Sequence, residues 1–381
     1  MLIGIVGKPN SGKSTFFKAA TMIDVKISSV PFTTIEPNVG IGYVVIDCVC
    51  KEFGVKCNPK YGKCVRGKRF VPIKLIDVAG LVPGAHKGRG LGNKFLDELR
   101  QADALIHIVD FSGKTDEEGK PTEKHDPEID IKFLEEEIDF WFKSIVEKAI
   151  QKFYKDKSPK KQPLIEYLYT QLSGLKISKD KIQEALDKKS IANVLEFSKY
   201  LRKISKPILI AANKIDLKSA QENFEKLKEK YEMIPTSSEA EVVLKTAHER
   251  GYIYYLPGNG FEAVKLLDET QKRILEIISK IIEKYGSTGV QTCLNKIVFD
   301  ILKMIVVYPV ASASKLCDKD GNVLPDAFIL PKGTKLIDLA FKIHSEIGKR
   351  FICGIDARTK KKLPADYELK DKDVIEIAFV R

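Results

Sequence analysis

The stretch Gly7-Lys8-Pro9-Asn10-Ser11-Gly12-Lys13-Ser14 matches the phosphate-binding pattern GxxxxGK[ST]. The apolar run Leu2–Val6 precedes it and is typical of a buried strand, while residues 15–20 are typical of the first turns of a helix. In that setting, glycines let backbone N–H groups wrap around phosphates, and the helix N-terminus adds the positive end of its dipole. Lys13 would reach the β- and γ-phosphates, and the Ser14 hydroxyl would bind Mg²⁺. The sequence therefore predicts an α/β protein that binds a nucleoside triphosphate.

Composition places this motif in a soluble protein of several domains. The chain has 381 residues, enough for two or three domains, with 44% hydrophobic and 30% charged residues. No apolar stretch approaches the roughly 18 residues of a membrane-spanning helix, and the first strand begins at Leu2. We therefore expect a cytoplasmic protein with no signal peptide and no membrane partner. The net charge of +12 indicates an anionic partner beyond the nucleotide, with RNA the first candidate.

A second apolar run, residues 72–76, leads into Asp77-Val78-Ala79-Gly80, the DxxG arrangement of a GTPase switch II. We expect Asp77 to hold Mg²⁺ and the Gly80 N–H to donate to the γ-phosphate. Between the two motifs lies the segment 31–37, which contains Thr33 and Thr34. Either hydroxyl could serve as the switch I ligand of Mg²⁺, and Thr34 is preferred.

Base recognition is predicted at Asn213-Lys214-Ile215-Asp216, which directly follows the apolar strand at 207–212. The Asp216 carboxylate can accept from guanine N1–H and N2–H₂ together, a pairing that adenine does not offer, so discrimination should be strong. Lys214 would cover one face of the base, and Asn213 would tie this loop to the phosphate loop. A backbone N–H of Ser237 or Ser238 could meet guanine O6.

The string from Asp77 to Leu96, DVAGLVPGAHKGRGLGNKFL, resembles switch II of Obg-family GTPases, and it is most similar to the YchF-like branch. The segment 31–40 and the phosphate loop agree with this resemblance. It implies a P-loop GTPase (G) domain, a C-terminal TGS domain and contact with ribosomes or RNA. YchF proteins usually carry a degraded NxxE motif and tolerate ATP, whereas NKID is intact here, so we expect GTP. A YchF-type ATPase and a largely non-hydrolytic, nucleotide-dependent binding module are the alternatives.

Hydrolysis is expected to be slow. Leu81 stands where Ras-like enzymes carry the glutamine that orients the attacking water, and leucine has no hydrogen-bonding group. Asn10 matches the phosphate-loop asparagine of potassium-stimulated GTPases, in which K⁺ supplies positive charge near the β–γ bridge. His107, on the strand at 104–110, could reach the site through water or could be a core histidine.

The expected site can be stated in full. The catalytic set is Lys13, Thr34, Asp77, Gly80, Leu81 and His107. The Mg²⁺ ligands are Ser14, Thr34 and Asp77. The nucleotide contacts are Gly7, Lys8, Pro9, Asn10, Ser11, Gly12, Lys13, Ser14, Thr15, Asp77, Gly80, Asn213, Lys214, Asp216, Ser237 and Ser238.

Periodicity predicts the domain organisation. The GTPase domain should be discontinuous, over 1–110 and 207–304, and a helical or coiled-coil insertion should fill 111–206. That insertion is polarised in charge, with 4 basic and 11 acidic residues in 111–142 and 16 basic and 7 acidic residues in 143–206. A solvated helical face and a contact for RNA or a ribosomal surface both fit the basic part. We expect a monomer.

The two C-terminal regions differ in pattern. Residues 240–304 have mainly helical spacing, whereas 305–381 show the ββαβ…β order of a small β-grasp, or TGS-like, domain. Within the tail, Thr334 is expected to cap a helix that ends at Gly348.

Four cysteines, Cys48, Cys50, Cys57 and Cys64, lie between two predicted strands. Their spacing, C-x-C-x₆-C-x₆-C, lacks the paired CxxC knuckles of common zinc sites. A bound metal, a disulfide and reduced thiols all remain open, and reduced thiols are favoured for a cytosolic chain.

Overall fold

The computed structural model describes residues 1–22, 38–78, 98–155 and 163–380. These residues form two compact units, each with its own hydrophobic core. The first unit holds residues 1–22 and 38–40 and the described part of 74–293. The second unit holds residues 41–73 and the described part of 294–381.

The main sheet places the nucleotide motifs at one edge. Its strand order is β2-β4-β1-β5-β6-β7, and the short β3 pairs with β4. Strand β1 is parallel to β4 and β5, and β6 is parallel to β5 and β7. Because parallel strands bring their carboxyl ends to the same edge, the segments that follow β1, β4, β6 and β7 come together there. The bounds are β1 (Leu2–Val6), β2 (Val39–Asp47), β3 (Lys63–Val65), β4 (Lys68–Asp77), β5 (Ala104–Asp110), β6 (Ile208–Asn213) and β7 (Met233–Pro235).

Helices α1 and α8 pack beside each other next to that edge. The Lys245 ammonium of α8 is buried, donates to the Ala19 carbonyl of α1 over 2.6 Å and pairs with Glu241 at 3.4 Å. Helix α9 begins with a capping box at Asp268 and ends at Gly286 in the left-handed conformation. The bounds are α1 (Lys13–Thr21), α7 (Lys218–Leu227), α8 (Ser238–Glu249), α9 (Glu269–Tyr285), α10 (Val290–Asn295) and a π-helix (Lys296–Ile301).

The mainly helical pattern predicted for 240–304 is interrupted at one place. Strands β8 (Ile253–Tyr255) and β9 (Phe261–Ala263) form a two-stranded antiparallel ribbon between α8 and α9. Aromatic and β-branched residues alternate in burial along β8, and the Pro257–Gly260 stretch between the strands supplies turn residues. These local preferences override the helical spacing of the flanking segments.

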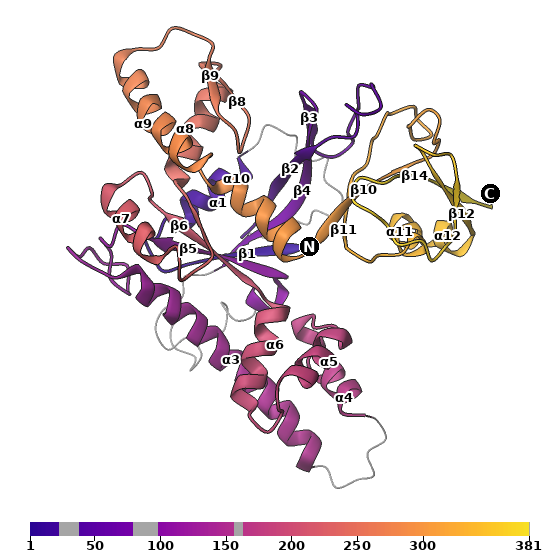
Figure 1. Ribbon diagram of the computed structural model, residues 1–381, viewed down its shortest axis with the longest axis horizontal. Coiled ribbons are helices and arrows are strands. Elements are labelled where there is room, and N and C mark those ends of the chain that lie inside the picture. Colours follow the sequence, from indigo (N-terminus) through magenta and orange to yellow (C-terminus); the bar gives the residue numbers. More distant parts are fainter. Residues whose placement is uncertain (23–37, 79–97, 156–162, 381) are drawn as a thin grey trace. The chain divides into compact units, whose positions relative to one another are not determined.

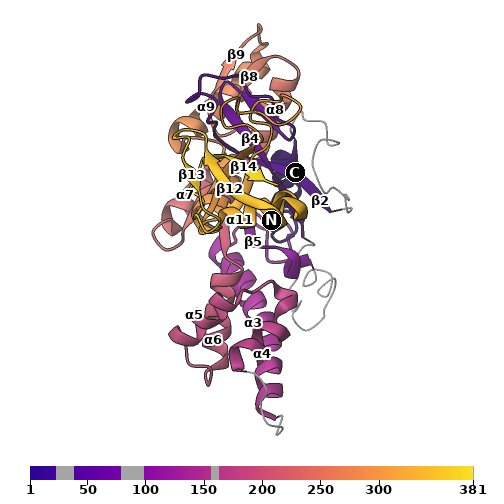
Figure 2. The ribbon, with the colours of Figure 1, turned by 90° about the vertical axis from the view of Figure 1, so that its right-hand side faces the viewer.

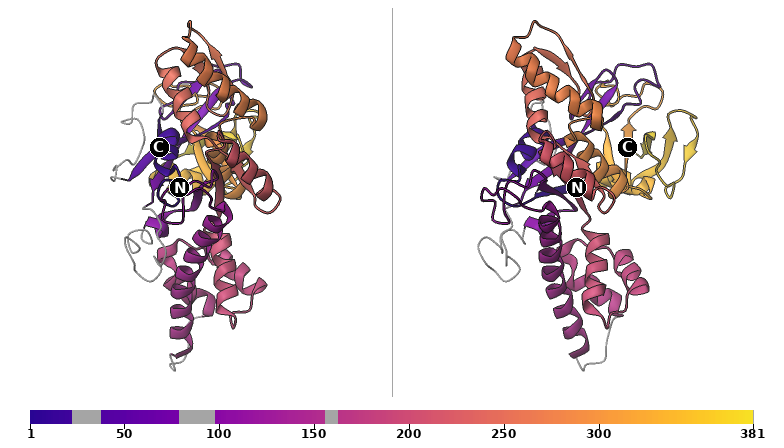
Figure 3. Two further views of the ribbon diagram at one scale, coloured as in Figure 1. Left: turned by 90° about the vertical axis from the view of Figure 1, so that its left-hand side faces the viewer. Right: turned by 60° about the vertical axis from the view of Figure 1, so that its left-hand side comes forward.

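Between β5 and β6 the chain builds a helical bundle, which lies at one end of the first unit (Figures 1 and 3). Helix α3 packs on α6 and α4, and α5 packs on α4 and α6. Buried residues such as Ile138, Phe142, Phe197 and Leu201 form its core. The bounds are α3 (Pro127–Lys155), α4 (Leu164–Gln171), a 3-10 turn (Ser173–Leu175), α5 (Lys179–Lys188) and α6 (Val194–Ser205).

Two features of the predicted insertion need correction. The insertion was expected as a helical hairpin or coiled-coil pair, but it is a bundle that includes α4 and α5 as well as α3 and α6. Helical structure also begins at Pro127 and not at residue 111. Residues 111–126 form turns instead, because Gly113 and Gly119 take positive φ and the Asp116 carboxylate accepts the N–H groups of Glu118 and Lys120.

In the second unit, a sheet of order β11-β10-β14-β12-β13 is covered by α11 and α12 (Figure 2). Strand β10 is parallel to β14, while β11, β12 and β13 pair antiparallel with their neighbours. Leu336, Leu339 and Ala340 pack in one core with Val307 and Ile375. The bounds are β10 (Met304–Val310), β11 (Phe328–Pro331), α11 (Leu336–Ile343), α12 (Ser345–Lys349), β12 (Phe351–Asp356), β13 (Lys362–Leu363) and β14 (Val374–Phe379).

The predicted single helix after Thr334 is also corrected. The Thr334 hydroxyl donates to the Pro331 carbonyl, so Lys335 and not Thr334 occupies the N-cap position of α11. His344 is extended and ends α11, and its ring Nδ1 accepts the Glu346 N–H to start α12. Gly348 therefore lies inside α12. In the described part of the chain, none of the helices is both long enough and apolar enough to span a membrane.

Candidate functional site

The phosphate loop depends on two glycines. A Cβ on Gly7 would lie 2.6 Å from the Ile108 carbonyl oxygen, and one on Gly12 would lie 2.1 Å from Asn213 Nδ2. Gly12 also has a φ of +94°, which side-chain-bearing residues rarely adopt. Helix α1 starts directly after it, with the Phe16 N–H donating to the Gly12 carbonyl over 2.9 Å. The sequence thus presents the free N–H groups of a helix N-terminus at the edge of the sheet.

Lys13, Ser14 and Asp77 gather at this edge. The Lys13 ammonium forms an ion pair with the Asp77 carboxylate at the end of β4, and Ser14, in the first turn of α1, is exposed. The Asp77 backbone is fixed because its N–H donates to the Asn38 carbonyl over 2.8 Å. A hydroxyl and a carboxylate are the hard oxygen donors that Mg²⁺ prefers, so this donor set fits the ion.

The base-recognition loop is joined to the phosphate loop through Asn213. Its buried side-chain amide donates to the Ser11 carbonyl over 2.9 Å, which is the predicted tie. Its Oδ1 accepts both the backbone N–H and the hydroxyl of Ser238, at 3.1 and 2.9 Å. One side chain therefore fixes the relative placement of the loops after β1, β6 and β7.

Asp216 is exposed, and its carboxylate is oriented by Ser237. The Ser237 hydroxyl donates to Asp216 Oδ1 over 2.7 Å and accepts the Ala240 N–H as the N-cap of α8. The Asp216 side chain therefore has one oriented oxygen and remains open to solvent, where a base edge with two donors could bind it.

The expected backbone contact of Ser237 or Ser238 with guanine O6 does not agree with this geometry. The Ser237 N–H donates to the Thr288 carbonyl over 2.8 Å, and the Ser238 N–H donates to Asn213. Both serines instead position the side chains of Asp216 and Asn213.

Lys214 joins the base-recognition loop to the end of β5. It has a φ of +65°, and its ammonium lies 2.8 Å from Oδ2 of the fully buried Asp110. Ser112 and Thr115 also donate to this carboxylate. Burial alone would raise the pKa of Asp110, but the hydrogen bonds from Lys214, Ser112 and Thr115 outweigh it and leave the pKa below its ordinary value.

Another set of contacts, which sequence reasoning missed, lies on the outer side of the phosphate loop. Lys8 is buried, donates to the Thr115 carbonyl over 2.7 Å and pairs with Asp130 of α3 at 2.8 Å. The Asn10 amide donates to the Gly119 carbonyl over 2.9 Å, and a Cβ on Gly119 would lie 2.5 Å from the Pro9 carbonyl oxygen. Gly113 and Gly119, with Asp116 between them, are the sequence signal that could have predicted a tight loop here. The Lys8 side chain thus has a structural partner, although the sequence placed this residue among the nucleotide contacts.

His107 lies on β5 opposite Val6, the residue before the phosphate loop. It is 3% exposed, and among the described residues its Nδ1 has no hydrogen-bond partner. Burial, followed by the charge of Lys8, lowers its pKa to about 3, so the imidazole is neutral at physiological pH. The expected site residues Thr34, Gly80 and Leu81 lie outside the described residues.

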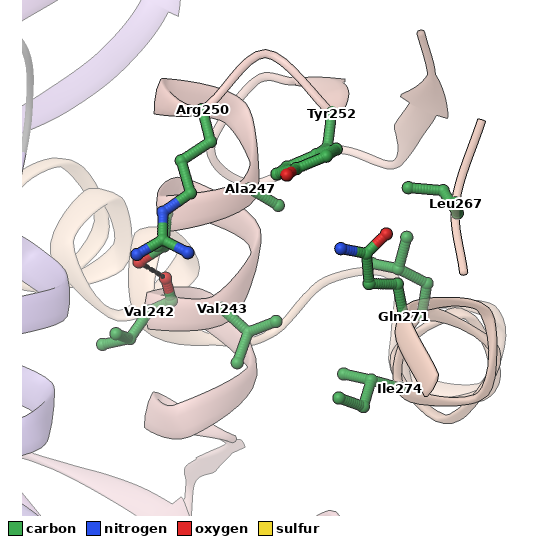
Figure 4. Close-up of a pocket in the computed structure, with 10 residues that line it drawn as sticks. Val242, Val243, Ala247, Arg250, Tyr252, Leu267, Gln271 and Ile274 are labelled. Carbon is green, nitrogen blue, oxygen red and sulfur yellow. Dashed lines mark hydrogen bonds between the residues drawn. The ribbon is translucent and has the colours of Figure 1, made fainter. Parts of the chain in front are cut away.

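A separate hollow of about 240 Å³ lies between the C-terminal half of α8 and α9. In Figure 4, Val242, Val243 and Ala247 line one side, and Gln271 and Ile274 of α9 face them. None of the residues that line this hollow belongs to the nucleotide motifs.

Comparison with known protein families gives three matches along the chain. A model described as a 50S ribosome-binding GTPase matches residues 2–143. A model described as the G4 motif-containing domain of an Obg-like, YGR210-like GTPase matches residues 211–312. A TGS domain model matches residues 319–378.

Full-length relatives agree with these matches. An uncharacterized GTP-binding protein of Methanocaldococcus jannaschii is 51% identical over 388 residues, which cover 99% of this chain and 98% of the relative. The ribosome-binding ATPase YchF of Bacillus subtilis is 34% identical over 408 residues, which cover 99% of this chain and 98% of that protein. The crystal structure of a GTP-binding protein from Pyrococcus horikoshii superposes with a TM-score of 0.79 at 39% identity, over the whole of both chains. The chain therefore belongs to the YchF-like family of Obg-like GTP-binding proteins, with a P-loop GTPase domain and a C-terminal TGS domain.

Proposed function

We propose that this protein binds GTP, hydrolyses it to GDP and phosphate in the cytoplasm, and uses its nucleotide state to control contact with the ribosome or with RNA. The observation that carries the proposal is the exposed Asp216 carboxylate, oriented by the Ser237 hydroxyl. It stands beside Asn213, which is bonded directly to the phosphate loop. A nucleotide whose phosphates lie in that loop would bring its base to Asp216, where guanine supplies two donors.

The phosphate side would work by positioning and charge. Lys13 would exchange Asp77 for the β- and γ-phosphates, with the N-terminus of α1 supplying further N–H donors. Ser14 and Asp77, together with Thr34, would hold Mg²⁺, and this ion would neutralise charge on the phosphate oxygens. Gly80 would hold the γ-phosphate through its N–H.

Slow hydrolysis follows from the chemistry of Leu81, which cannot orient water. We propose K⁺, held with the help of Asn10, as the source of extra positive charge in the transition state. The neutral, buried His107 is the other candidate, and it could act only as a hydrogen-bonding group and not as a proton donor at neutral pH.

Two observations support a ribosomal or RNA partner. The full-length Bacillus subtilis relative is named a ribosome-binding ATPase. Residues 143–206 include the C-terminal part of α3 and all of α4, α5 and α6. They carry 16 basic and 7 acidic residues. A basic surface of this kind suits RNA phosphates.

Base selectivity tests the proposal directly. The purified protein is titrated with GDP, GTP, ADP and ATP by calorimetry, and turnover of GTP and ATP is then measured in the presence of Mg²⁺. We expect guanine nucleotides to bind at least ~100-fold more tightly than adenine nucleotides, because adenine leaves the Asp216 carboxylate unpaired. Comparable affinities would contradict a GTPase and favour an ATPase of the kind named in Bacillus subtilis.

A further inference from the structure

The second unit contains a cluster of four cysteine side chains. Cys48 follows β2, Cys50 and Cys57 lie in the connecting loop, and Cys64 is in β3. The fold brings all four sulfur atoms within 4.8 Å of one another. The Sγ atoms of Cys48 and Cys57 are 3.9 Å apart, as are those of Cys50 and Cys64.

These distances suit a tetrahedral metal centre. A disulfide requires sulfur atoms about 2.05 Å apart, so no pair in the cluster is bonded. Four thiolates about 2.3 Å from a central Zn²⁺ would be separated from one another by about 3.8 Å. The observed spacing of 3.9 Å in two pairs is already close to that value. Four mutually close sulfurs are the closed donor set of a structural zinc site, which leaves no position for substrate.

The backbone around the cluster is fixed by its own hydrogen bonds. The Cys48 N–H donates to the Gly67 carbonyl over 2.9 Å, and the Cys50 carbonyl accepts the Val55 N–H over 3.0 Å. Cys48 and Cys50 are buried, while Cys57 and Cys64 are half-buried. An ion could therefore reach the sulfurs without unfolding the core beneath them.

Buried polar groups beside Cys48 support an anionic centre. The Arg69 guanidinium is fully buried, its NH groups donate to the Leu324 and Pro325 carbonyls, and its charge acts on Cys48. Within the part of the chain that the structure describes, its Nε has no hydrogen-bond partner, and the hydroxyl of the buried Tyr308 lies beside Cys48. The hydrogen bonds of this buried cation go to neutral carbonyls, and the carboxyl group of Asp326, whose pKa burial raises, is an acidic group on which its charge acts. Zn²⁺ with four thiolates carries a net charge of −2, which would compensate the charge of Arg69 and accept hydrogen bonds.

We propose that Cys48, Cys50, Cys57 and Cys64 bind one Zn²⁺ ion as a tetrahedral structural site. Binding would convert the four thiols to thiolates, with the protons released to solvent. The site is separate from the proposed GTPase chemistry and does not depend on it.

The contacts of the cysteine loop indicate what the ion would stabilise. Within the second unit, the N–H groups of Asn58 and Lys60 donate to the Val323 and Pro325 carbonyls over 2.8 and 3.0 Å. The Lys60 ammonium also lies 2.6 Å from Asp318. Zinc would therefore hold the loop that anchors residues 318–325, at the start of the segment that matches the TGS domain.

Metal content gives the first test. Full-length protein is purified under reducing conditions, supplied with Zn²⁺ and dialysed into metal-free buffer before elemental analysis. We expect about one Zn²⁺ per chain. Cys57→Ser and Cys64→Ser should lose this zinc, while Cys317→Ser and Cys353→Ser, half-buried cysteines of the same unit, should keep it. Wild-type protein without zinc, or with iron in its place, would contradict the proposal.

A second test avoids variants that fail to fold. Zinc is removed from the wild-type protein with a chelator under reducing conditions and replaced by Co²⁺. We expect intense visible d–d bands and a thiolate-to-cobalt charge-transfer band in the near ultraviolet, as tetrahedral tetrathiolate sites give. Weak octahedral bands would overturn the assignment, as would disulfides revealed by thiol alkylation and intact mass. Amide exchange at Asn58 and Lys60 should accelerate in the zinc-free protein, and unchanged exchange would contradict the structural role.

Discussion

Selectivity for the base rests on one carboxylate. Asp216→Asn replaces an acceptor by a donor, so we expect GDP affinity to fall by ~100-fold or more and the preference to move toward xanthosine diphosphate. Calorimetric titration with both nucleotides measures the change. Ser237→Ala is the matched variant, because it keeps the carboxylate and removes only its orienting hydrogen bond. It should weaken GDP binding less than Asp216→Asn does. If Asp216→Asn prefers GDP over xanthosine diphosphate as strongly as the wild type does, the role assigned to Asp216 is contradicted.

His107 should make stability depend on pH. In the unfolded chain this group takes up a proton below about pH 6.5, whereas in the fold it remains neutral until about pH 3. Because the unfolded state binds the extra proton in that window, stability should fall as the pH decreases from 6.5, by up to about 1.4 kcal/mol per pH unit. Urea unfolding at pH 7, 6 and 5 measures this slope. His107→Gln should flatten it, and identical slopes for the two proteins would show that His107 is not the group responsible.

At the residue scale, prediction succeeded where a motif fixes the partner. The tie from Asn213 to the phosphate loop was expected from NKxD and is present. The expected O6 contact at Ser237 or Ser238 failed, because the acceptor of the Ser237 N–H is Thr288, which is distant in sequence. The burial of Lys8 against Asp130 was not predicted for the same reason: the two residues are distant in sequence, and no local pattern links them.

At the element scale, the ion pair between Lys8 and Asp130 joins the phosphate loop to α3. Both side chains are 5% exposed, so Asp130→Asn would leave a buried, uncompensated ammonium. We expect this variant to lose about 3–5 kcal/mol of the free energy of unfolding. The double variant Lys8→Met, Asp130→Leu should lose less than the sum of the single changes, since it leaves no unpaired ammonium, although His125, 2.9 Å from Asp130, loses a partner. Denaturant unfolding of the wild type, Lys8→Met, Asp130→Leu and the double variant measures the coupling, and additive losses would contradict it.

Asn10 of the phosphate loop allows a test of whether K⁺ stimulates hydrolysis. If Asn10 helps to hold K⁺, replacement of K⁺ by Na⁺ should slow GTP hydrolysis, and Asn10→Ala should remove that sensitivity. Initial rates in matched potassium and sodium salts test this. The Asn10 amide donates to the Gly119 carbonyl, so the stability of Asn10→Ala must be checked by thermal unfolding. Equal wild-type rates in both salts would eliminate the hypothesis and direct attention to His107.

Elements with strong periodicity were predicted close to their observed bounds. Strands β1 and β5 match the predicted ranges, because buried parallel strands have continuous apolar runs. The turns of 111–126 and the ribbon of β8 and β9 were missed, since both depend on short-range turn chemistry inside segments of helical spacing. A metal site at the four cysteines could not be preferred over reduced thiols from their spacing alone. The pairing of β3 with β4 and the turns after β2, which the spacing does not reveal, bring the sulfurs together.

At the scale of the whole molecule, deletion of the C-terminal residues is a poor test of which surface binds a partner, because it would disturb the fold of the second unit. Deletion of residues 305–381 would remove the Leu324 and Pro325 carbonyls that accept from the fully buried Arg69. It would also remove the whole C-terminal sheet, β10 to β14, apart from Met304. A truncated chain would expose a buried charge, so loss of ribosome binding would not identify a contact surface. Substitution of exposed charges on the full chain is the sharper test.

The basic segment 143–206 offers charges for such a test, and of the four lysines chosen Lys157, Lys160 and Lys161 lie outside the described residues. We expect reversal of Lys155, Lys157, Lys160 and Lys161 to glutamate to weaken binding to ribosomal subunits, and to reduce the dependence of that binding on salt, because fewer counterions are released. Reversal of Lys272, Arg273, Lys280 and Lys284, four exposed residues of α9, changes the net charge by the same amount and serves as the matched control. GTP affinity should stay unchanged in both variants, since neither set belongs to the nucleotide motifs. Equal losses in the two variants would indicate a general charge effect and not a contact on the bundle.

Co-sedimentation with ribosomal subunits then tests whether the nucleotide acts as a switch. Lys8 and Asn10 connect the phosphate loop to residues 115–130, which lead directly into α3, so a change at the loop has a physical route to the bundle. Binding should therefore differ between the GDP-bound protein and the protein bound to a non-hydrolysable GTP analogue. By thermodynamic linkage, ribosomal subunits should change the ratio of the two nucleotide affinities by the same factor. Identical sedimentation in both states, with an unchanged ratio, would leave an RNA-binding GTPase without a switch.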